Sequence, residues 1–443
     1  MTSPTTPIPA PATPSVVRNP DFVRLWIAET ISQFGTQISL LALPLVAVSL
    51  LDATPFEVAM LGTIEFLPFI LFSLPAGAWV DRLRRRPILI AGDIGRALVL
   101  VSVPIAYLLG VLSIWQLFVV GFIAGTLTVL FDVAYQSYLP ALVDRDQLVD
   151  GNGKLEISRT IAQTAGPALG GGLIGLITAP LAILLDSVSY GASAFFVWLI
   201  RKREPTPDPH VDEHGRERGG LVSEVRDGLR YVLGNEYLRA IAACTGTSNF
   251  FNNIATATIL VYLVRELGLT PAAIGLALGL GNLGALLGAV SANRIRLAIG
   301  LGPAIVVSAA LGGPALLLIA IAPADIAVPF LIGSGLLAGF SSVVYNINQV
   351  SFRQAITPLP MQGRMNATMR FIVWGTIPIG AVVGGIIATA VSVHAAIWVG
   401  TIGMFLAVLP VLLTRVRTLR DMPTPAGDEP TAGVGVADPE ATA

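Results

Sequence analysis

The hydrophobic positions of the chain fall into long uninterrupted runs, which short polar stretches separate. Most runs contain about 20 apolar residues, the length a helix needs to cross the hydrocarbon core of a bilayer. We expect helices only, because a lone strand leaves its backbone hydrogen bonds unsatisfied in lipid. The pattern therefore predicts an all-α integral membrane protein with twelve transmembrane helices. The predicted spans are residues 22–50, 57–80, 87–110, 113–139, 155–178, 180–200, 238–264, 271–293, 302–322, 326–350, 366–391 and 394–414.

Composition and charge support a membrane protein. Hydrophobic residues make up 54% of the 443 residues and charged residues only 12%, whereas about 25% of a soluble domain is charged. With the N-terminus in the cytoplasm, 23 of the 27 Lys and Arg residues lie on that side and Arg265 lies outside. The other three, Arg96, Arg159 and Arg370, fall within spans. Because positive residues are retained inside, we predict a multi-pass protein of the plasma membrane with both termini cytoplasmic and no nucleic-acid partner.

The chain divides into two halves of six predicted spans each. The halves share an internal repeat at a constant offset of 214 residues, at which Gly121 matches Gly335 and Gly166 matches Gly380. This repeat predicts two parallel bundles that face each other across a site at the middle of the membrane. The expected domains are a disordered tail (1–20), a first bundle (21–200), a cytoplasmic linker with an amphipathic helix (201–237), a second bundle (238–418) and a second disordered tail (419–443).

The loop between the second and third spans carries a distinctive motif. It reads Gly77-Ala-Trp-Val-Asp81-Arg82-Leu-Arg-Arg85-Arg-Pro87 and resembles the G-x-x-x-D-R-x-x-R-[RK] pattern of major facilitator superfamily transporters. With Ser32-Gln-Phe-Gly35 and Asp93-Ile-Gly-Arg96, residues 18–418 resemble the branch that holds macrolide efflux proteins and the enterobactin exporter. The resemblance implies the fold of this superfamily, with two pseudo-symmetric six-helix bundles.

The same resemblance implies a role for the loop motif. In similar transporters its acid caps a helix end and an arginine pairs with an acid low in the fourth span, which holds the halves together in the outward-facing state. The matching gating network here is Asp81, Arg82, Arg85 and Asp132. An unpaired carboxylate near the end of a span is costly, and an arginine partner relieves that cost. The alternative is that the arginines only fix the topology.

A second motif lies in the fifth span. Gly166, Pro167, Gly170 and Gly171 match the G-P-x-x-G-G motif of drug:proton antiporters. The proline kinks the helix, and the glycines let a neighbouring helix approach closely. Packing alone is the alternative interpretation. The resemblance favours export.

Polar side chains repeat at helical spacing along spans 1, 4, 7 and 10. These are the spans that line the central cavity in the superfamily which the chain resembles. Because a polar stripe facing lipid is expensive, we expect the stripes to face the interior. Hydrogen bonding between helices is the alternative. The candidate substrate-cavity residues are Gln33, Gln37, Gln136, Asn249, Asn252, Asn253, Asn346 and Gln349.

Three acids within spans, Glu29, Glu65 and Asp93, are candidates for proton coupling. Asp93 lies one turn from Arg96, and we expect these two to pair. Glu65 has no local partner, and a carboxyl isolated in an apolar span is protonated part of the time, as a proton carrier must be. A further acid, Asp186, is expected at the membrane interface.

These features favour a secondary transporter that exports a hydrophobic or amphipathic small molecule (a drug, macrolide or siderophore-like compound) by proton-coupled antiport. An importer or facilitator of the same fold is the alternative. An integral membrane lipid-modifying enzyme is a remote one, since we find neither a nucleophile motif nor metal-ligand spacing. A phosphate-binding loop is also missing from the sequence. We therefore expect a monomeric transporter rather than an enzyme, without cofactor or metal, whose partners are its substrate, protons and the lipid bilayer.

Overall fold

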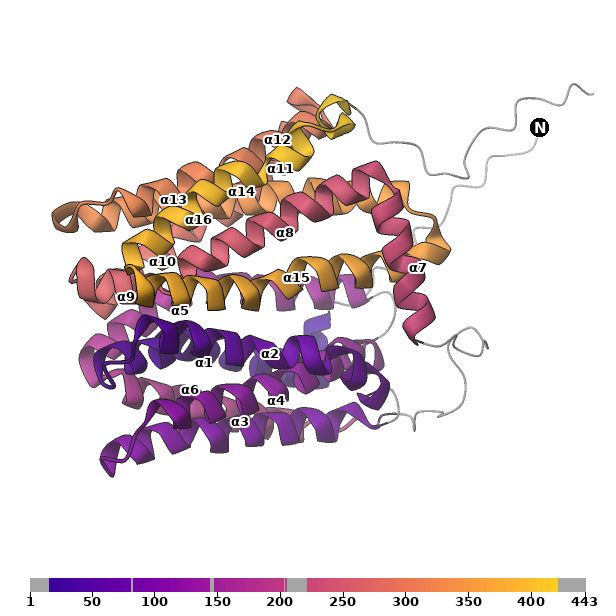
Figure 1. The fold of residues 1–443 in the computed structure, drawn as a ribbon. Helices are drawn as coiled ribbons and strands as arrows, with labels where there is room; N and C mark the ends of the chain where they lie inside the picture. Colours follow the sequence, from indigo (N-terminus) through magenta and orange to yellow (C-terminus); the bar gives the residue numbers. More distant parts are fainter. Residues whose placement is uncertain (1–15, 81–82, 144–146, 203, 205–220, 421–443) are drawn as a thin grey trace, which may run out of the picture.

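The computed structural model describes residues 16–80, 83–143, 147–202, 204 and 221–420, which form helices joined by short connections (Figure 1). Apolar runs become helices because every backbone hydrogen bond is then made within the segment. The first half contains η1 (Val16–Arg18), α1 (Pro20–Ser49), α2 (Pro55–Val80), α3 (Arg85–Leu108), α4 (Ile114–Leu142), α5 (Leu148–Ile177) and α6 (Ala179–Trp198).

The second half begins after the linker, and its spans are more often interrupted. Short breaks divide three of them, so that α10 with α11, α12 with α13, and α16 with α17 each form one crossing. Its elements are α7 (Leu221–Gly234), α8 (Glu236–Thr256), α9 (Ile259–Val261), η3 (Tyr262–Glu266), α10 (Pro271–Gly281), α11 (Leu283–Ile299), α12 (Leu301–Ala310), α13 (Gly312–Ala320), η4 (Ala324–Ile326), α14 (Ala327–Ile356), α15 (Leu359–Ala390), α16 (Val393–Ala407), α17 (Leu409–Leu412) and η5 (Arg415–Thr418).

The helices follow the sequence repeat. An offset of 214 residues carries the first residue of α6, Ala179, onto Val393, where α16 begins. The first long helix of each half also starts in the same way. The Asn19 side-chain oxygen accepts hydrogen bonds from the backbone N–H groups of α1, and Asn235 caps α8 likewise. Such caps satisfy amide groups that the helix itself leaves without partners.

Eleven crossings in the described part of the chain are long and apolar enough to span a membrane. The predicted seventh span, which corresponds to α8, falls below that hydropathy because it carries Asn249, Asn252 and Asn253. It nevertheless packs against α15 and α16 and lies alongside the other long helices (Figure 1). With α8 included, each half is a six-helix bundle.

The hydrophobic core is shared at one end of the molecule and divided at the other. We call the end at which α1 begins and α6 ends the linker end, and the opposite end the far end. One apolar cluster at the far end combines residues of both halves, including Leu45, Val58, Ile274 and Ile397. At the linker end, one cluster belongs to the first half alone and another to the second half alone. The halves are therefore joined mainly at the far end.

Two pairs of helices make the main contacts between the halves, α5 with α10 and α2 with α15. Polar contacts at the far end reinforce them. The Arg265 guanidinium donates to the Val48 carbonyl oxygen at 3.1 Å, and the Phe56 amide donates to the Thr389 hydroxyl at 3.2 Å. The linker helix α7 packs against α8 and α15 of the second half.

The expected tails of residues 1–20 and 419–443 extend too far into the chain. Val16 is fully buried in the core of the first half at the linker end. At the other terminus, the Leu301 amide donates to the Arg420 carbonyl oxygen at 3.1 Å. Both segments therefore pack on the bundles, and the outer parts of both predicted tails lie outside the described residues.

Candidate functional site

A cavity of about 1100 Å³ lies between the halves, with most of its wall in the second half. Its lining comes from α8 and the helices that follow, and from Gln37, Leu40, Leu41 and Pro167 of the first half. This volume is that of a site for a drug-sized molecule. The cavity lies where the two linker-end cores separate from the shared far-end core.

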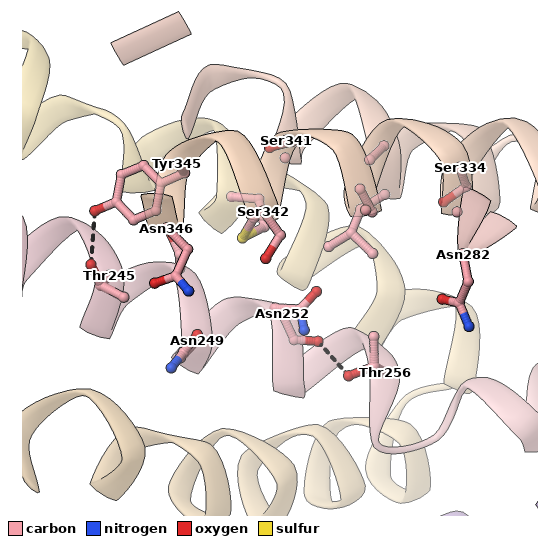
Figure 2. A pocket seen from close by; sticks show the side chains of 18 of the residues that line it. Thr245, Asn249, Asn252, Thr256, Asn282, Ser334, Ser341, Ser342, Tyr345 and Asn346 are labelled. Atoms are coloured by element: carbon pink, nitrogen blue, oxygen red, sulfur yellow. Dashed lines mark hydrogen bonds between the residues drawn. The ribbon is translucent and has the colours of Figure 1, made fainter. Parts of the chain in front are cut away.

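Polar groups of α8 and α14 face each other across this cavity (Figure 2). The side chains of Asn249 and Asn252 enter it from α8, and Asn346 enters from α14. Hydrogen bonds fix part of this wall. The Thr245 and Tyr345 hydroxyl oxygens are 2.7 Å apart. Amides and hydroxyls that are held in this way can bind polar groups of a ligand without restricting its apolar body.

The predicted cavity residues have different positions in the structure. Gln33 does not line the cavity but donates to the Glu29 carboxylate at 2.7 Å. Asn253 donates to the Asn249 carbonyl oxygen at 2.9 Å and lies against α15 rather than on the wall, since neighbouring positions of a helix point about 100° apart. The Gln136 side chain lies outside the described part of the structure. The remaining five predicted residues, Gln37, Asn249, Asn252, Asn346 and Gln349, line the cavity.

Two arginines on the cavity wall were missed as site residues. From the sequence, Arg353 is one of the 23 Lys and Arg residues expected on the cytoplasmic side, and Arg370 falls within a span without an assigned role. In the structure both line the cavity, and the Arg370 guanidinium lies 5.3 Å from the centroid of the Trp374 ring. For Arg370 the sequence did contain a signal of a functional residue, because a cation in an apolar span without an acid one turn away is costly unless it binds a partner.

A buried charge cluster, made of Glu29, Asp93, Arg96 and Asp132, lies within the first half. The Arg96 guanidinium donates to the Asp93 carboxylate, which confirms the predicted pair. Asp93 also accepts a hydrogen bond of 2.7 Å from the Ser193 hydroxyl. Because Asp93 is 0% and Arg96 4% exposed, each charge depends on the other for its stabilisation.

The rest of the cluster surrounds Arg96. Its guanidinium carbon lies 4.2 Å from the ring centroids of both Phe131 and Tyr190. Glu29 and Asp132 both interact with it electrostatically. Aromatic faces and carboxylates together hold a buried guanidinium in place. Arg96 is therefore the centre of the cluster.

Two of the proton-coupling candidates keep a carboxylate oxygen that is buried without a hydrogen-bond partner among the described residues, Oε2 of Glu29 and Oε1 of Glu65. Glu65 packs on α4, where a Cβ atom on Gly121 would come within 2.9 Å of its Cγ atom. A carboxyl group in such a place is a natural site for a proton, since protonation removes the unpaired charge.

The structure gives Arg85 a different partner from the one expected. Its guanidinium lies 3.1 Å from a carboxylate oxygen of Glu204, and its backbone amide donates to the other oxygen at 2.7 Å. The α4 helix continues to Leu142, so Asp132 lies about 15 Å inside its end and interacts with Arg96 and Arg159. The expected Arg85–Asp132 pair is therefore absent from this state. The other members of the predicted network, Asp81 and Arg82, lie outside the described residues.

Asp186, which is expected at the membrane interface, is buried between helices. This residue is 1% exposed, and its carboxylate accepts from the Ser189 hydroxyl at 3.1 Å. It packs against α1 at Gly35, where a Cβ atom would come 2.4 Å from the carboxylate. Glycine at that position gives α6 its close approach to α1.

The glycines of the span-five motif lie in contacts between helices. A Cβ atom on Gly166 would come 2.5 Å from the Gln37 Cβ atom, within the first half. One on Gly171 would come 2.3 Å from the Pro271 carbonyl oxygen of α10, across the contact between the halves. In this state the motif serves close packing, and its Pro167 lines the cavity.

Two six-helix bundles that share a sequence repeat and enclose a cavity between them are typical of major facilitator superfamily transporters. Residues 11–431 match the family model described as transmembrane secretion effector. The chain belongs to this family.

Named relatives include efflux pumps. The chain is 26% identical over 417 residues to the multidrug efflux pump Tap of Mycolicibacterium fortuitum, covering 87% of this chain and 93% of that protein. It is 24% identical to Tap of Mycobacterium tuberculosis, covering 91% and 93%. The MFS-type transporter YfiS of Bacillus subtilis matches at 24% identity over 62% of this chain and 64% of its own length.

Solved structures share the fold. A bacterial homologue of the iron transporter ferroportin in its inward-facing state has a TM-score of 0.70 at 17% identity, covering 90% of this chain and 99% of that one. A structure described as the outward-facing state of such a homologue has a TM-score of 0.53 at 18% identity, covering 89% and 98%. The nucleoside transporter NupG has a TM-score of 0.71 at 11% identity, covering 89% and 99%.

Proposed function

We propose that this protein exports an amphipathic small molecule across the plasma membrane by alternating access, coupled to proton entry. The observation that carries the proposal is the cavity between two bundles that share a core only at the far end. A molecule can enter such a cavity from the linker end, which we take to be the cytoplasmic side on the basis of the arginine distribution. The Tap efflux pumps among the relatives support the outward direction.

Transport would require the far-end contacts to separate while the linker ends close. The two helix pairs between the halves, α5 with α10 and α2 with α15, would act as the pivots of this rocking motion. The shared apolar core would then open toward the outside. Arg85, which pairs with Glu204 in this state, would be free to take part in the gating network when the linker ends approach each other.

Proton coupling would use Glu29 or Glu65. Each has a buried carboxylate oxygen without a hydrogen-bond partner among the described residues. Glu29 also interacts electrostatically with Arg96 and Asp132, so that a proton on Glu29 would change the balance of the buried charge cluster. A carboxyl that alternates between a proton and a charged neighbour can link proton entry to a conformational change.

The test is accumulation of a panel of macrolides, siderophore-like compounds and amphipathic dyes in a bacterial host that lacks its own efflux pumps. Expression should lower the accumulation of at least one compound, and a proton uncoupler should remove the effect. Glu29→Gln or Glu65→Gln should abolish the uncoupler-sensitive part. Glu156→Gln is the matched control, because that side chain is 68% exposed and has no part in the proposed proton coupling.

Each outcome has a distinct meaning. Higher accumulation on expression would favour the importer alternative over export. Efflux that survives the uncoupler, or survives both glutamine variants, would contradict proton coupling at these residues.

The orientation is tested separately, by labelling a cysteine introduced at the exposed Arg417 of η5. The native Cys244 is buried and should stay unlabelled. Labelling of position 417 from outside intact cells would reverse the proposed direction.

A further inference from the structure

The charge of the cavity is unbalanced. Arg353 and Arg370 both line it, and no carboxylate is present among the described residues that line it. We infer that the transported molecule carries an anionic group, such as a carboxylate, on an apolar body. This inference rests on the proposed function, because it assumes that this cavity is the transport site.

The spans of the second half contain few acids that could neutralise the arginines. At the start of α8, Glu236 lies 3.9 Å from Arg415, and the side chains of the two acids of α7 lie outside the described part of the structure. From residue 238 to residue 418 the sequence contains only two acids, Glu266 and Asp325. Both lie near the far end, at the end of η3 and in η4. An intramembrane cation without a fixed counter-ion is costly. A bound anion would supply that counter-ion.

The environment of each arginine points to a ligand. The Arg353 Nε atom is buried without a hydrogen-bond partner among the described residues. Arg370 lies over the Trp374 ring, a contact that orients a guanidinium without cancelling its charge. A guanidinium presents its donors in a fork that matches a carboxylate. Both side chains therefore remain available to bind an anion.

The charge of the cavity wall is concentrated toward the linker end. Arg353 lies three residues before the linker end of α14, and Arg370 lies in the linker-side half of α15. No arginine lines the cavity toward the far end, where apolar residues such as Leu263, Leu316 and Ile319 are mixed with the uncharged polar residues Thr256, Asn282 and Ser334 (Figure 2). An amphipathic anion would therefore lie with its charge toward the linker end and its apolar body toward the shared core.

The test compares two dyes that share a xanthene ring system and differ in charge. Fluorescein is an anion and tetramethylrhodamine methyl ester is a cation. Binding of each to the purified full-length protein in lipid nanodiscs is measured by fluorescence polarisation. We expect the wild type to bind fluorescein at least about tenfold more tightly, which corresponds to about 1.4 kcal/mol.

Variants then identify the residues responsible. Arg353→Gln and Arg370→Gln should each weaken fluorescein binding about tenfold and leave the cationic dye unchanged or bound more tightly. Arg370→Lys keeps the charge and should retain most of the affinity. Arg417→Gln removes an exposed arginine of η5 outside the cavity and should behave as wild type. Thermal unfolding of each variant shows that it is folded.

Several outcomes would overturn the inference. These are equal affinity for the two dyes, preference for the cation, no binding of either dye, or equal losses for both dyes in a folded Arg370→Gln variant. Dye accumulation in the efflux-deficient host is measured in parallel. A protein that exports only cations would retain the proposed function and lose this inference, whereas one that lowers the accumulation of no dye and no compound of the panel would lose the proposed function.

Discussion

The two halves of this transporter have the same helices and opposite polar chemistry. At the offset of 214 residues, Asp132 of the first half corresponds to Asn346 of the second. Likewise Arg96 corresponds to Ala310, and the cavity residue Arg370 corresponds to Glu156. The repeated fold has been kept, while its buried acids remain in one half and its cavity cations lie in the other.

From this comparison we propose that the two halves of one fold carry two different tasks. The buried charges of the first half are arranged around one another, as Asp93 and Arg96 show. The polar groups of the second half face an open cavity instead, as Asn249 and Asn346 do (Figure 2). A buried cluster of charges suits a switch, and an open polar wall suits a variable ligand. Function here resides in the side chains that each half carries on a common scaffold.

The largest effect should come from breaking the buried pair of the first half. Asp93→Asn leaves the Arg96 guanidinium without its ionic partner, which should cost about 3–5 kcal/mol of stability. The double variant Asp93→Val/Arg96→Ala copies the equivalent residues Val307 and Ala310 of the second half. It should recover part of that loss, because neither member of the Asp93–Arg96 pair is left without the other. Thermal unfolding of the purified protein in detergent measures both effects.

Efflux gives the second readout for these variants. We expect both of them to lose uncoupler-sensitive transport, since neither retains the cluster around Arg96. An Asp93→Asn protein as stable as wild type would show that the pair is not needed for folding. A fully active double variant would show that the first half does not need its charge cluster, and the division of tasks between the halves would be wrong.

A smaller effect is expected where the halves meet. Gly171 and Gly385 are equivalent by the repeat and lie in the two contacts between the halves. A Cβ atom on Gly171 would come 2.3 Å from a backbone oxygen of Pro271, whereas one on Gly385 would come 2.8 Å from the side chain of Ala59. Gly171→Ala should therefore disturb the far-end contact more, by about 1–3 kcal/mol, and Gly385→Ala less.

The adjacent Gly172 supplies the matched control, because a Cβ atom there would meet no neighbour within 4 Å. Efflux rate and thermal stability should fall in the order Gly172→Ala, Gly385→Ala, Gly171→Ala, with the first equal to wild type. Equal behaviour of all three would mean that the far-end contacts do not limit either property. A reversed order would place the tighter pivot between α2 and α15.

The fold could be predicted because its main determinants are local in the sequence. Apolar run length fixed the spans, and the repeat fixed their division into halves. Errors arose at helix ends, where polar residues extend a membrane helix beyond its apolar part. The fourth span was predicted to end at residue 139 and continues to Leu142, and the tenth was predicted to end at 350 and continues to Ile356. The added residues place Arg353 within α14 and move the end of α4 farther from Asp132.

The candidate site was predictable only in part. Asp93 and Arg96 are one turn apart, so their pairing follows from helix geometry. Periodicity also identified Asn249 and Asn252 as one face of a helix. It could not show that the cavity lies mainly in the second half, because that depends on how the two bundles lean against each other. The partner of Arg85 lies 119 residues away at Glu204, beyond any local pattern.

The smallest effect is expected at the loop motif, where the halves also differ. Position 299, the equivalent of Arg85, is an isoleucine, so the second half folds without this ion pair. Arg85 is 22% exposed and Glu204 3% in their side chains. The backbone amides of Arg85 and Arg86 still donate to Glu204 in an Arg85→Gln variant, so the variant should lose only about 1 kcal/mol of stability. Ile299→Gln is the control at the matching loop.

If Arg85→Gln keeps its stability but loses efflux, the arginine acts in a state other than this one, as the gating network requires. If both stability and efflux stay near wild type, the loop arginines only fix the orientation of the chain in the membrane. The Arg85 loop and its equivalent in the second half would then differ in charge without differing in mechanism.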